Sequence, residues 1–317
     1  MELESSSASL PHTTSIVQVL DEHRALVARR VMAGASGAET LAAMTEFVDG
    51  LIIGRYRDAM RQGGDETATV GMQQCCLMAL GGYGRRELAP QSDIDLMFLY
   101  QAGSGKAVES LIRAVLHPLW DCGFQVGHSV RTIADSIELA ETDATVKTSM
   151  MEARFLAGSS DLFQEFHRKY WRKIVSKNSD LYLDQKLEER RREYQKFGET
   201  VYLLEPNVKK SKGGLRDLHL LQWAGMARFQ APTMRELSDR GILSRADSLA
   251  LTEAREFLWR VRALLHVHAG APQEILTFDE QVWLAQHFGY HDQPHLLAVE
   301  QFMQQYYQHT MGLHERC

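Results

Sequence analysis

The stretch Leu80-Gly-Gly-Tyr-Gly-Arg-Arg-Glu-Leu-Ala-Pro-Gln-Ser-Asp-Ile-Asp-Leu96 joins two apolar segments through a glycine-rich turn, and it is the most informative part of the sequence for the fold. Residues 75–80 before the glycines are continuously apolar. Residues 96–99 after the aspartates are apolar as well. Short apolar runs bounded by glycine and proline are typical of buried strands. The pattern therefore predicts a strand, a glycine turn and a second strand over residues 93–100.

Asp93 and Asp95 lie two positions apart in the second expected strand. Side chains two apart leave the same face, so both carboxylates point one way while Ile94, Leu96 and Phe98 pack on the other face. At about 3.3 Å per residue their Cα atoms are about 6.6 Å apart, close enough for both carboxylates to bind one divalent-metal site. An isolated Asp-x-Asp more often ends a turn and faces solvent. The preceding glycines favour a catalytic site instead.

The turn itself has the chemistry of a phosphate-binding segment. Gly81 and Gly82 permit positive φ angles and let backbone N–H groups approach phosphate oxygens closely. Arg85 adds a permanent cation with planar donors for the same oxygens. We therefore predict that a phosphate-bearing ligand binds here, beside the two aspartates.

The N-terminal segment differs in composition from the rest of the chain. Residues up to Pro11 are Ser-rich and are expected to be disordered. Helical spacing of apolar residues begins at Ser15 and recurs over residues 39–60. The polar, glycine-bearing residues 63–69 are typical of a linker.

Beyond the glycine–aspartate stretch, the pattern predicts a helix over residues 108–120 and an alternating third strand over residues 124–132. From Ala134 onward the pattern is helical almost throughout. The expected fold is therefore α+β, with a mixed sheet flanked by N-terminal helices and a C-terminal helical domain. The expected parts are residues 1–70 for the tail and first helices, 71–155 for the core and 156–317 for the helical domain.

Gly81-Gly82, Arg85 and Ser92-Asp-Ile-Asp95 together resemble the nucleotide-binding signature of the DNA polymerase β superfamily. The longer string Gly-Gly-Tyr-Gly-Arg-x-Glu-Leu-x-Pro-x-Ser-Asp-Ile-Asp-Leu is similar to that of bacterial PII uridylyltransferases. The resemblance covers roughly residues 77–307 and continues through Val126-Gly-His-Ser-Val-Arg131, Glu152-Ala-Arg-Phe-Leu-Ala-Gly158, Glu205-Pro-Asn207, Lys212-Gly-Gly-Leu-Arg-Asp217 and Phe257-Leu-Trp-Arg-Val-Arg262.

This resemblance implies a polymerase β-like nucleotidyltransferase core in which Asp93 and Asp95 are catalytic and bind Mg²⁺ or Mn²⁺. The nucleotide-binding residues that it implies in the turn are Gly81, Gly82, Arg85 and Ser92. It also implies UTP as the donor, a tyrosine of a PII-type signal protein as the acceptor of UMP, pyrophosphate as the product and a role in nitrogen regulation.

The segment Lys212-Gly-Gly-Leu-Arg-Asp217 is the second candidate for the site. Two glycines before an Arg-Asp pair can form a phosphate-facing turn that opens a helix. The same residues fit a connection between helices with a surface ion pair equally well. The resemblance favours the first interpretation. The nucleotide-binding residues that it implies here are Gly213, Gly214, Arg216 and Asp217, with Asn207 and Lys209 as weaker candidates.

The sequence departs from the family pattern in several places. Many superfamily members supply a third carboxylate from a later strand, whereas residues 124–132 contain no acid. Asp135, Glu138 or Glu152 can fill that place from nearby, or the site works with two acids, and the sequence leaves these alternatives open. Arg86 stands where many family members have glycine. Full family members also continue into a hydrolytic metal domain and ligand-sensing domains.

Composition narrows the class of partner. The chain is 44% hydrophobic and 24% charged, and no segment reaches the run of about 18 apolar residues that a membrane span needs. A net charge of −6 makes nucleic acid an unlikely main partner. The acidic N-terminus is unlike a secretory signal, and the four cysteines have the spacing of neither a zinc site nor a disulfide scaffold. A cytoplasmic protein is expected.

Two further features of the sequence do not indicate a functional site. The charged residues 188–193 are typical of a solvated helix face rather than a nucleic-acid patch. His266 and His268 lie two apart on an expected helix and point to different faces, which is more typical of core or surface histidines than of metal ligands.

Two alternatives to UMP transfer remain open from the sequence. One is a catalytically silent nucleotide-binding module that docks a partner, and retention of both aspartates argues against it. The other is a nucleotidyltransferase with a different acceptor, such as glutamine synthetase or a small molecule, which nothing in the glycine–aspartate stretch excludes.

Overall fold

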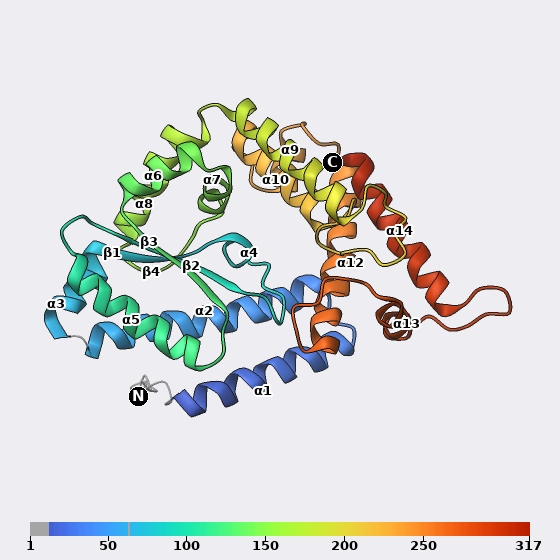
Figure 1. Ribbon diagram of the computed structural model, residues 1–317, viewed down its shortest axis with the longest axis horizontal. Helices are drawn as coiled ribbons and strands as arrows, with labels where there is room; N and C mark the ends of the chain where they lie inside the picture. Colours follow the sequence, from blue (N-terminus) through green and yellow to red (C-terminus); the bar gives the residue numbers. More distant parts are fainter. Residues whose placement is uncertain (1–12, 63) are drawn as a thin grey trace, which may run out of the picture.

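The computed structural model describes residues 13–62 and 64–317, which form a sheet-containing part and a helical part (Figure 1). The predicted α+β class with a mixed sheet is confirmed. The strands are β1 (Cys75–Ala79), β2 (Ile94–Tyr100), β3 (Val126–Arg131) and β4 (Arg154–Gly158). The helices are α1 (Thr13–Met32), α2 (Gly37–Gln62), α3 (Gly64–Thr69), α4 (Gly81–Gly84), α5 (Gly105–Asp121), α6 (Ile133–Thr142), α7 (Ala144–Met151), α8 (Ser160–Tyr170), α9 (Ser179–Phe197), α10 (Leu215–Phe229), α11 (Met234–Asp239), α12 (Arg245–Ala269), α13 (Phe278–His287) and α14 (Ala298–Arg316), with π-helical turns η1 (Val70–Gln74) and η2 (Trp171–Val175). The disorder expected up to Pro11 lies outside the described residues.

Within the described residues the strand order is β3-β2-β1-β4, in which β1 is antiparallel to both neighbours and β2 is parallel to β3. Ile94, Leu96 and Phe98 of β2 pack in the core with α2 and α5, as the alternation predicts. Met97 and Leu99 on the opposite face are buried too, on the side of α6, α7 and α8. Helices therefore cover both faces of β2, and the expected charged face is limited to the start of the strand.

Two local predictions are wrong. Residues 64–69, expected in a linker, form α3, which leads into the turn that buries Val70 and seats Gly71 against Met60 of α2. Residues 154–158, expected in a helical region, form β4, because pairing with β1 satisfies their backbone groups at the edge of the sheet. The divisions expected at residues 70 and 155 remain predictions.

Helix α2 links the two parts of the molecule. Leu41, near its start, belongs to the core of the helical part, whereas Val48 belongs to the core that lies against the sheet. Its N-terminus approaches α12 so closely that a Cβ on Gly37 would lie 2.6 Å from the Cβ of Trp259. On the other face of the sheet, Trp223 of α10 packs with strand residues. The interface between the two parts is therefore stabilised by hydrophobic clusters to which both parts contribute residues.

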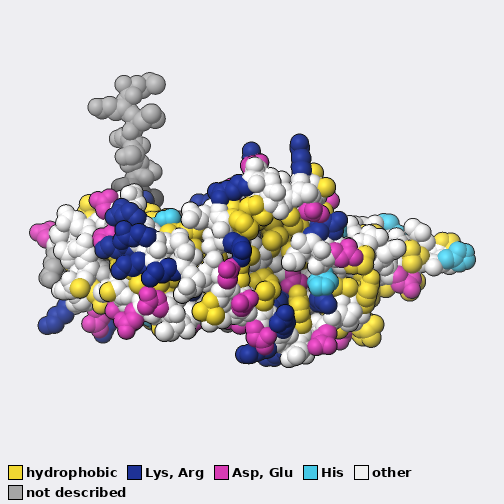
Figure 2. All heavy atoms as spheres, turned by 90° about the horizontal axis from the view of Figure 1, so that it is seen from above, with side chains coloured by type: hydrophobic (Ala, Val, Ile, Leu, Met, Phe, Trp, Pro, Cys, Tyr) yellow, Lys and Arg dark blue, Asp and Glu magenta, His cyan; other side chains and the backbone are white. Residues whose placement is uncertain are grey.

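The face seen from above in Figure 2 is mixed in character, with a hydrophobic area at its centre, Lys and Arg side chains gathered at its left and charges of both signs elsewhere. Among the described residues, no helix combines the length and the apolar character needed to cross a membrane.

Candidate active site

A cavity of about 570 Å³ lies between α4, the start of β2 and helices α7, α9 and α10. The predicted site residues that line it are Gly81, Gly82, Arg85, Ser92, Asp93, Asp95 and Arg216. The predicted residues outside its lining are Gly213, Gly214 and Asp217. The fold thus brings the glycine turn and both aspartates together with one residue of the second candidate segment, which lies far away in the sequence.

Asp95 occupies a space that two glycines leave open. Asp93 is exposed just before β2, and Asp95 is partly buried within the strand. A Cβ on Gly81 would lie 3.2 Å from Oδ2 of Asp95, and a Cβ on Gly127 would lie 2.6 Å from its Oδ1. Gly127 is the residue of β3 opposite Asp95 in the register. Sequence reasoning missed Gly127, because its importance as a residue without a side chain depends on the pairing of β3 with β2.

The two carboxylates form a negative pair that the protein does not neutralise by direct contact. Burial raises the pKa of Asp95 and the charge of Asp93 raises it further, while Lys209 lowers it. Within residues 13–62 and 64–317, neither carboxylate has a hydrogen-bond or ion-pair partner. Such a pair favours binding of a cation, because a cation removes the repulsion between the two charges.

The donor set fits Mg²⁺ bound together with a substrate. The described part of the chain has no group of three or more His, Cys, Asp or Glu side chains arranged to hold a metal ion. Mg²⁺ at phosphate-transfer sites is usually bound by one or two carboxylates, with substrate phosphates and water completing its coordination. Asp93 and Asp95 supply that number of carboxylates beside a cavity.

The turn α4 brings backbone against the carboxylates. Gly81 has a φ of +55°, and a Cβ on Gly84 would lie 2.3 Å from the carbonyl oxygen of Glu152, so a side chain at either position requires a shift. The first N–H groups of a helical turn have no partner inside it and can donate to phosphate oxygens. Arg86, which replaces the glycine that the resemblance implied, has a φ of 62°. Arg86 therefore adopts the left-handed conformation that glycine adopts easily, at a conformational cost of roughly 1–2 kcal/mol.

Arg85 is surrounded by protein carboxylates. Its Nε donates to Glu87 over 2.9 Å and its Nη1 to Glu152 over 2.6 Å, and its side chain is 12% exposed. Burial disfavours the charged guanidinium, but Glu87 and Glu152 outweigh burial and raise the pKa of Arg85. Burial lowers the pKa of His219, whose Nε2 lies 2.8 Å from Glu87, to about 3. The counter-charges of Arg85 are therefore fixed parts of the protein.

Of the residues considered for a third carboxylate, Glu152 lines the cavity, whereas Asp135 and Glu138 do not. Asp135 instead caps the N-terminus of α6. Glu152 is buried and accepts hydrogen bonds from Arg85 and from the indole of Trp223. Its charge is already paired with Arg85, which argues against a role for Glu152 as a third metal ligand, and the metal-binding role of the two aspartates remains a prediction.

Lys209 and Arg216 are two of the seven Lys and Arg side chains of the helical part that line the cavity. Burial lowers the pKa of Lys209 to about 8, with a contribution from the nearby charge of Arg262. Among the described residues the ammonium group has no hydrogen-bond or ion-pair partner. Arg216 lies over the ring of Trp223, its Nε is buried without a hydrogen bond, and its closest carboxylate, Glu193, is 3.9 Å away. Both cations are therefore only weakly compensated by the protein.

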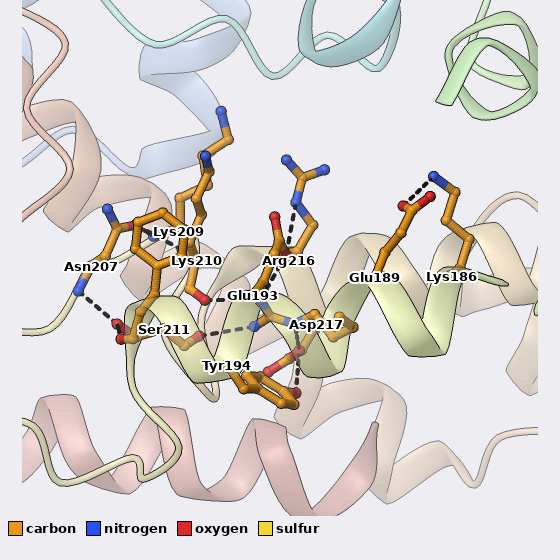
Figure 3. A network of polar contacts seen from close by, with 12 residues as sticks. Lys186, Glu189, Glu193, Tyr194, Asn207, Lys209, Lys210, Ser211, Arg216 and Asp217 are labelled. Atoms are coloured by element: carbon orange, nitrogen blue, oxygen red, sulfur yellow. Dashed lines mark hydrogen bonds and ion pairs between the residues drawn. The ribbon is translucent and has the colours of Figure 1, made fainter. Parts of the chain in front are cut away.

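Asp217 lies behind the cavity and ties α9 to the start of α10 (Figure 3). Its Oδ1 accepts hydrogen bonds from Arg190 over 2.5 Å and from the hydroxyl of Tyr194 over 2.7 Å. Its Oδ2 accepts one from the N–H of Gly213 over 2.7 Å. The side chain of Asp217 is 2% exposed. These contacts are those of a residue that holds the segment in place.

The expectation of a solvated face over residues 188–193 is wrong for Arg190. Arg191 and Arg192 are exposed, whereas Arg190 is 4% exposed and is held by Asp217, by Glu193 and by two backbone carbonyls. The helix turns this one arginine toward α10, where buried acceptors compensate its charge. A run of three arginines gives no sequence signal for which of them is buried.

Ser92 contacts a second ion pair that sequence reasoning missed. Its hydroxyl accepts a hydrogen bond from Arg262 over 3.2 Å, and both carboxylate oxygens of Glu274 accept from the same guanidinium. His266 is fully buried nearby, and His268 is partly exposed and bonded to a carboxylate of α13. The interpretation of these histidines as core and surface residues is confirmed.

Two family models match the chain. The model described as GlnD PII-uridylyltransferase matches residues 182–317, which include Lys209 and Arg216. The model described as Glutamate-ammonia ligase adenylyltransferase matches residues 17–115, which include the glycine turn and both aspartates.

Curated relatives match three quarters or more of the chain. The "Bifunctional uridylyltransferase/uridylyl-removing enzyme" of Novosphingobium aromaticivorans is 35% identical over 314 residues, which is 96% of this chain and 34% of that protein. The proteins of the same name from Rhodospirillum rubrum and Cereibacter sphaeroides are 41% identical over 239 residues and 38% identical over 273 residues. These matches cover 75% and 86% of this chain, and 25% and 29% of the relatives. The chain therefore spans about a third or less of the length of these relatives.

Proposed function

Because this chain belongs to the family of bacterial PII uridylyltransferases, we propose that it transfers UMP from UTP to a tyrosine of a PII-type signal protein and releases pyrophosphate. The observation that carries the proposal is the pair Asp93 and Asp95, which lies beside a glycine turn in a cavity that also holds Lys209 and Arg216. Paired carboxylates, backbone donors and cations are the groups that nucleotidyl transfer requires.

Each group has a distinct part in the proposed reaction. Asp93 and Asp95 hold Mg²⁺ or Mn²⁺, which when bound stabilises negative charge on the phosphate oxygens during displacement at the α-phosphorus. The backbone N–H groups of α4 donate to oxygens of the triphosphate. The hydroxyl of the acceptor tyrosine has an ordinary pKa of about 10, so it loses its proton to water as its oxygen bonds to the α-phosphorus and the bond from that phosphorus to pyrophosphate breaks.

The test combines donor and acceptor in one assay. The chain is incubated with a PII-type protein, Mg²⁺ and each of four labelled nucleoside triphosphates, and label on the PII protein is measured. We expect labelling from UTP, and none when Asp95→Asn replaces the wild type. Absence of labelling from every donor, with the wild type folded and binding nucleotide, contradicts transfer and supports the silent binding module.

The match of the adenylyltransferase family model to residues 17–115 supports a second candidate reaction for this site. In that reaction the donor is ATP and the acceptor is glutamine synthetase. The same assay with glutamine synthetase as the acceptor separates the two. Label from ATP on glutamine synthetase, with none from UTP on the PII protein, supports the second reaction.

A further inference from the structure

We propose that Lys209 and Arg216 hold the triphosphate of the bound nucleotide, whereas Arg85 stabilises the fold beside the site and does not bind phosphate. This inference rests on the proposed nucleotidyl transfer and assigns the phosphate contacts to particular side chains. It reverses the order of importance that the resemblance implied, in which Arg85 was a phosphate ligand and Lys209 a weaker candidate.

The charge of Arg85 is already compensated inside the protein. Two of its nitrogens donate to buried carboxylates of Glu87 and Glu152, and Nη2 lies 3.2 Å from Nε2 of His219. If Arg85 turned toward a phosphate, both carboxylates would be left buried without their counter-charge, which is unfavourable. The ligand contact would have to exceed that loss.

Lys209 and Arg216 are in the opposite situation. The ammonium of Lys209 has no hydrogen-bond or ion-pair partner in the described residues, and Nε of Arg216 is buried without an acceptor. Partly buried cations that lack acceptors lose hydration without compensation. A polyanion in the cavity supplies the acceptors that the protein does not provide, so binding it is favourable.

The two side chains also point the right way. Figure 3 shows both extending to the same side, away from α9, and both line the cavity that contains Asp93 and Asp95. The two aspartates would hold a divalent cation and the two cations would hold a triphosphate within the same cavity.

The backbone that carries Lys209 is fixed before a ligand arrives. Oδ1 of Asn207 accepts hydrogen bonds from the N–H groups of Lys209 and Lys210, at 3.1 and 2.7 Å. Oγ of Ser211 accepts from the N–H of Asn207 and donates to the carbonyl of Phe197. The loop is thus closed on itself and attached to the end of α9, so the backbone at Lys209 is held in place by bonds that do not involve its side chain.

The start of α10 is fixed in a similar way. Asp217 binds Arg190 of α9 and the N–H of Gly213, and a Cβ on Gly213 would lie 2.2 Å from the carbonyl oxygen of Thr310. A Cβ on Gly214 would lie 2.7 Å from the carbonyl oxygen of Val208. Both glycines are therefore required for close packing, and Asp217 is a positioning residue for Arg216.

The experiment compares triphosphate binding with nucleoside binding. Affinities for UTP with Mg²⁺ and for uridine are measured by titration calorimetry for the wild type, Lys209→Gln and Arg216→Gln. Lys212→Gln is the matched control, since Lys212 lies in the same loop over the ring of Tyr194 and outside the cavity lining. We expect each of the two variants to lose roughly 10- to 100-fold in UTP affinity, with uridine affinity and the Lys212→Gln control unchanged.

Arg85 is tested with Arg85→Lys, which keeps the charge but loses the fork of donors. We expect a lower midpoint of thermal unfolding and an unchanged ratio of UTP to uridine affinity. A ratio that falls in Arg85→Lys, or UTP affinities within about twofold of the wild type in both Lys209→Gln and Arg216→Gln, overturns the inference and leaves the proposed function intact. A folded wild type that binds no nucleoside triphosphate overturns the proposed function itself.

Discussion

Asp95 in β2 was expected to bind metal and Asp217 at the start of α10 to bind nucleotide, but the structure gives the two carboxylates opposite surroundings. Asp217 is buried and accepts hydrogen bonds from Arg190, Tyr194 and the N–H of Gly213. Asp95 lies beside Asp93, and within the described residues no donor or cation contacts it directly. One carboxylate is fully satisfied by the protein, and the other is not.

This difference separates a structural role from a chemical one. A buried carboxylate with three donors stabilises the folded state, because removing it strands the groups that it satisfies. An unpaired carboxylate next to a second carboxylate destabilises the folded state until something else binds. Unsatisfied charge at the edge of a cavity is therefore the stronger sign of function, and it points to β2 rather than to the start of α10.

The largest expected effect is on catalysis, at β2. Asp93→Asn and Asp95→Asn each remove a metal-binding charge, so we expect UMP transfer to fall roughly 10³-fold or more. The initial rate of PII labelling at saturating UTP and Mg²⁺ measures this. Turnover within tenfold of the wild type in either variant contradicts the assignment of these residues.

The stability of the metal-free protein provides a second test of the difference between Asp95 and Asp217. Because burial and Asp93 raise the pKa of Asp95, its charged form costs stability at neutral pH when no cation is bound. Asp95→Asn removes that cost, so in the absence of metal its urea midpoint is expected to equal or exceed that of the wild type. A clear fall in the midpoint shows that Asp95 has a structural role instead.

The next effect is on stability, at α10. Asp217→Asn removes the charge that compensates Arg190 and weakens three hydrogen bonds, and we expect the free energy of unfolding to fall by about 1–3 kcal/mol. Urea unfolding followed by circular dichroism measures it. The affinity for uridine is expected to remain near that of the wild type. Unchanged stability combined with lost UTP binding restores Asp217 as a nucleotide ligand.

The local pattern was sufficient to predict the strands around the glycine turn, because each element there is determined by adjacent residues. An apolar run, glycines and a second apolar run specify strand, turn and strand without help from the rest of the chain. β4 was missed for the opposite reason. Its residues Arg154–Gly158 show no clear alternation, and their strand character comes from pairing with β1, more than seventy positions earlier.

The candidate site was predicted in part for the same reason. Asp93, Asp95 and the glycine turn are recognisable from spacing alone. The partners of Arg85 and Arg190 are not, because Glu152 lies 67 positions from Arg85 and Asp217 lies 27 positions from Arg190. A sequence shows that a charged residue is present, but whether its charge is already compensated depends on the tertiary contacts.

The smallest expected effect concerns the space around Asp95. In Gly127→Ala the new Cβ would lie 2.6 Å from Oδ1 of Asp95, so the carboxylate must turn away from its present position. Small displacements of catalytic groups are costly, and we expect UMP transfer to fall on the order of 10-fold.

Gly105→Ala is the control, since a Cβ at this position in the first turn of α5 meets nothing within 4 Å. Alanine replaces glycine in both variants, so an equal loss of activity in the two is a general effect and contradicts the argument. A loss confined to Gly127→Ala, with both variants at least as stable as the wild type, shows that β3 contributes to catalysis by leaving this position without a side chain.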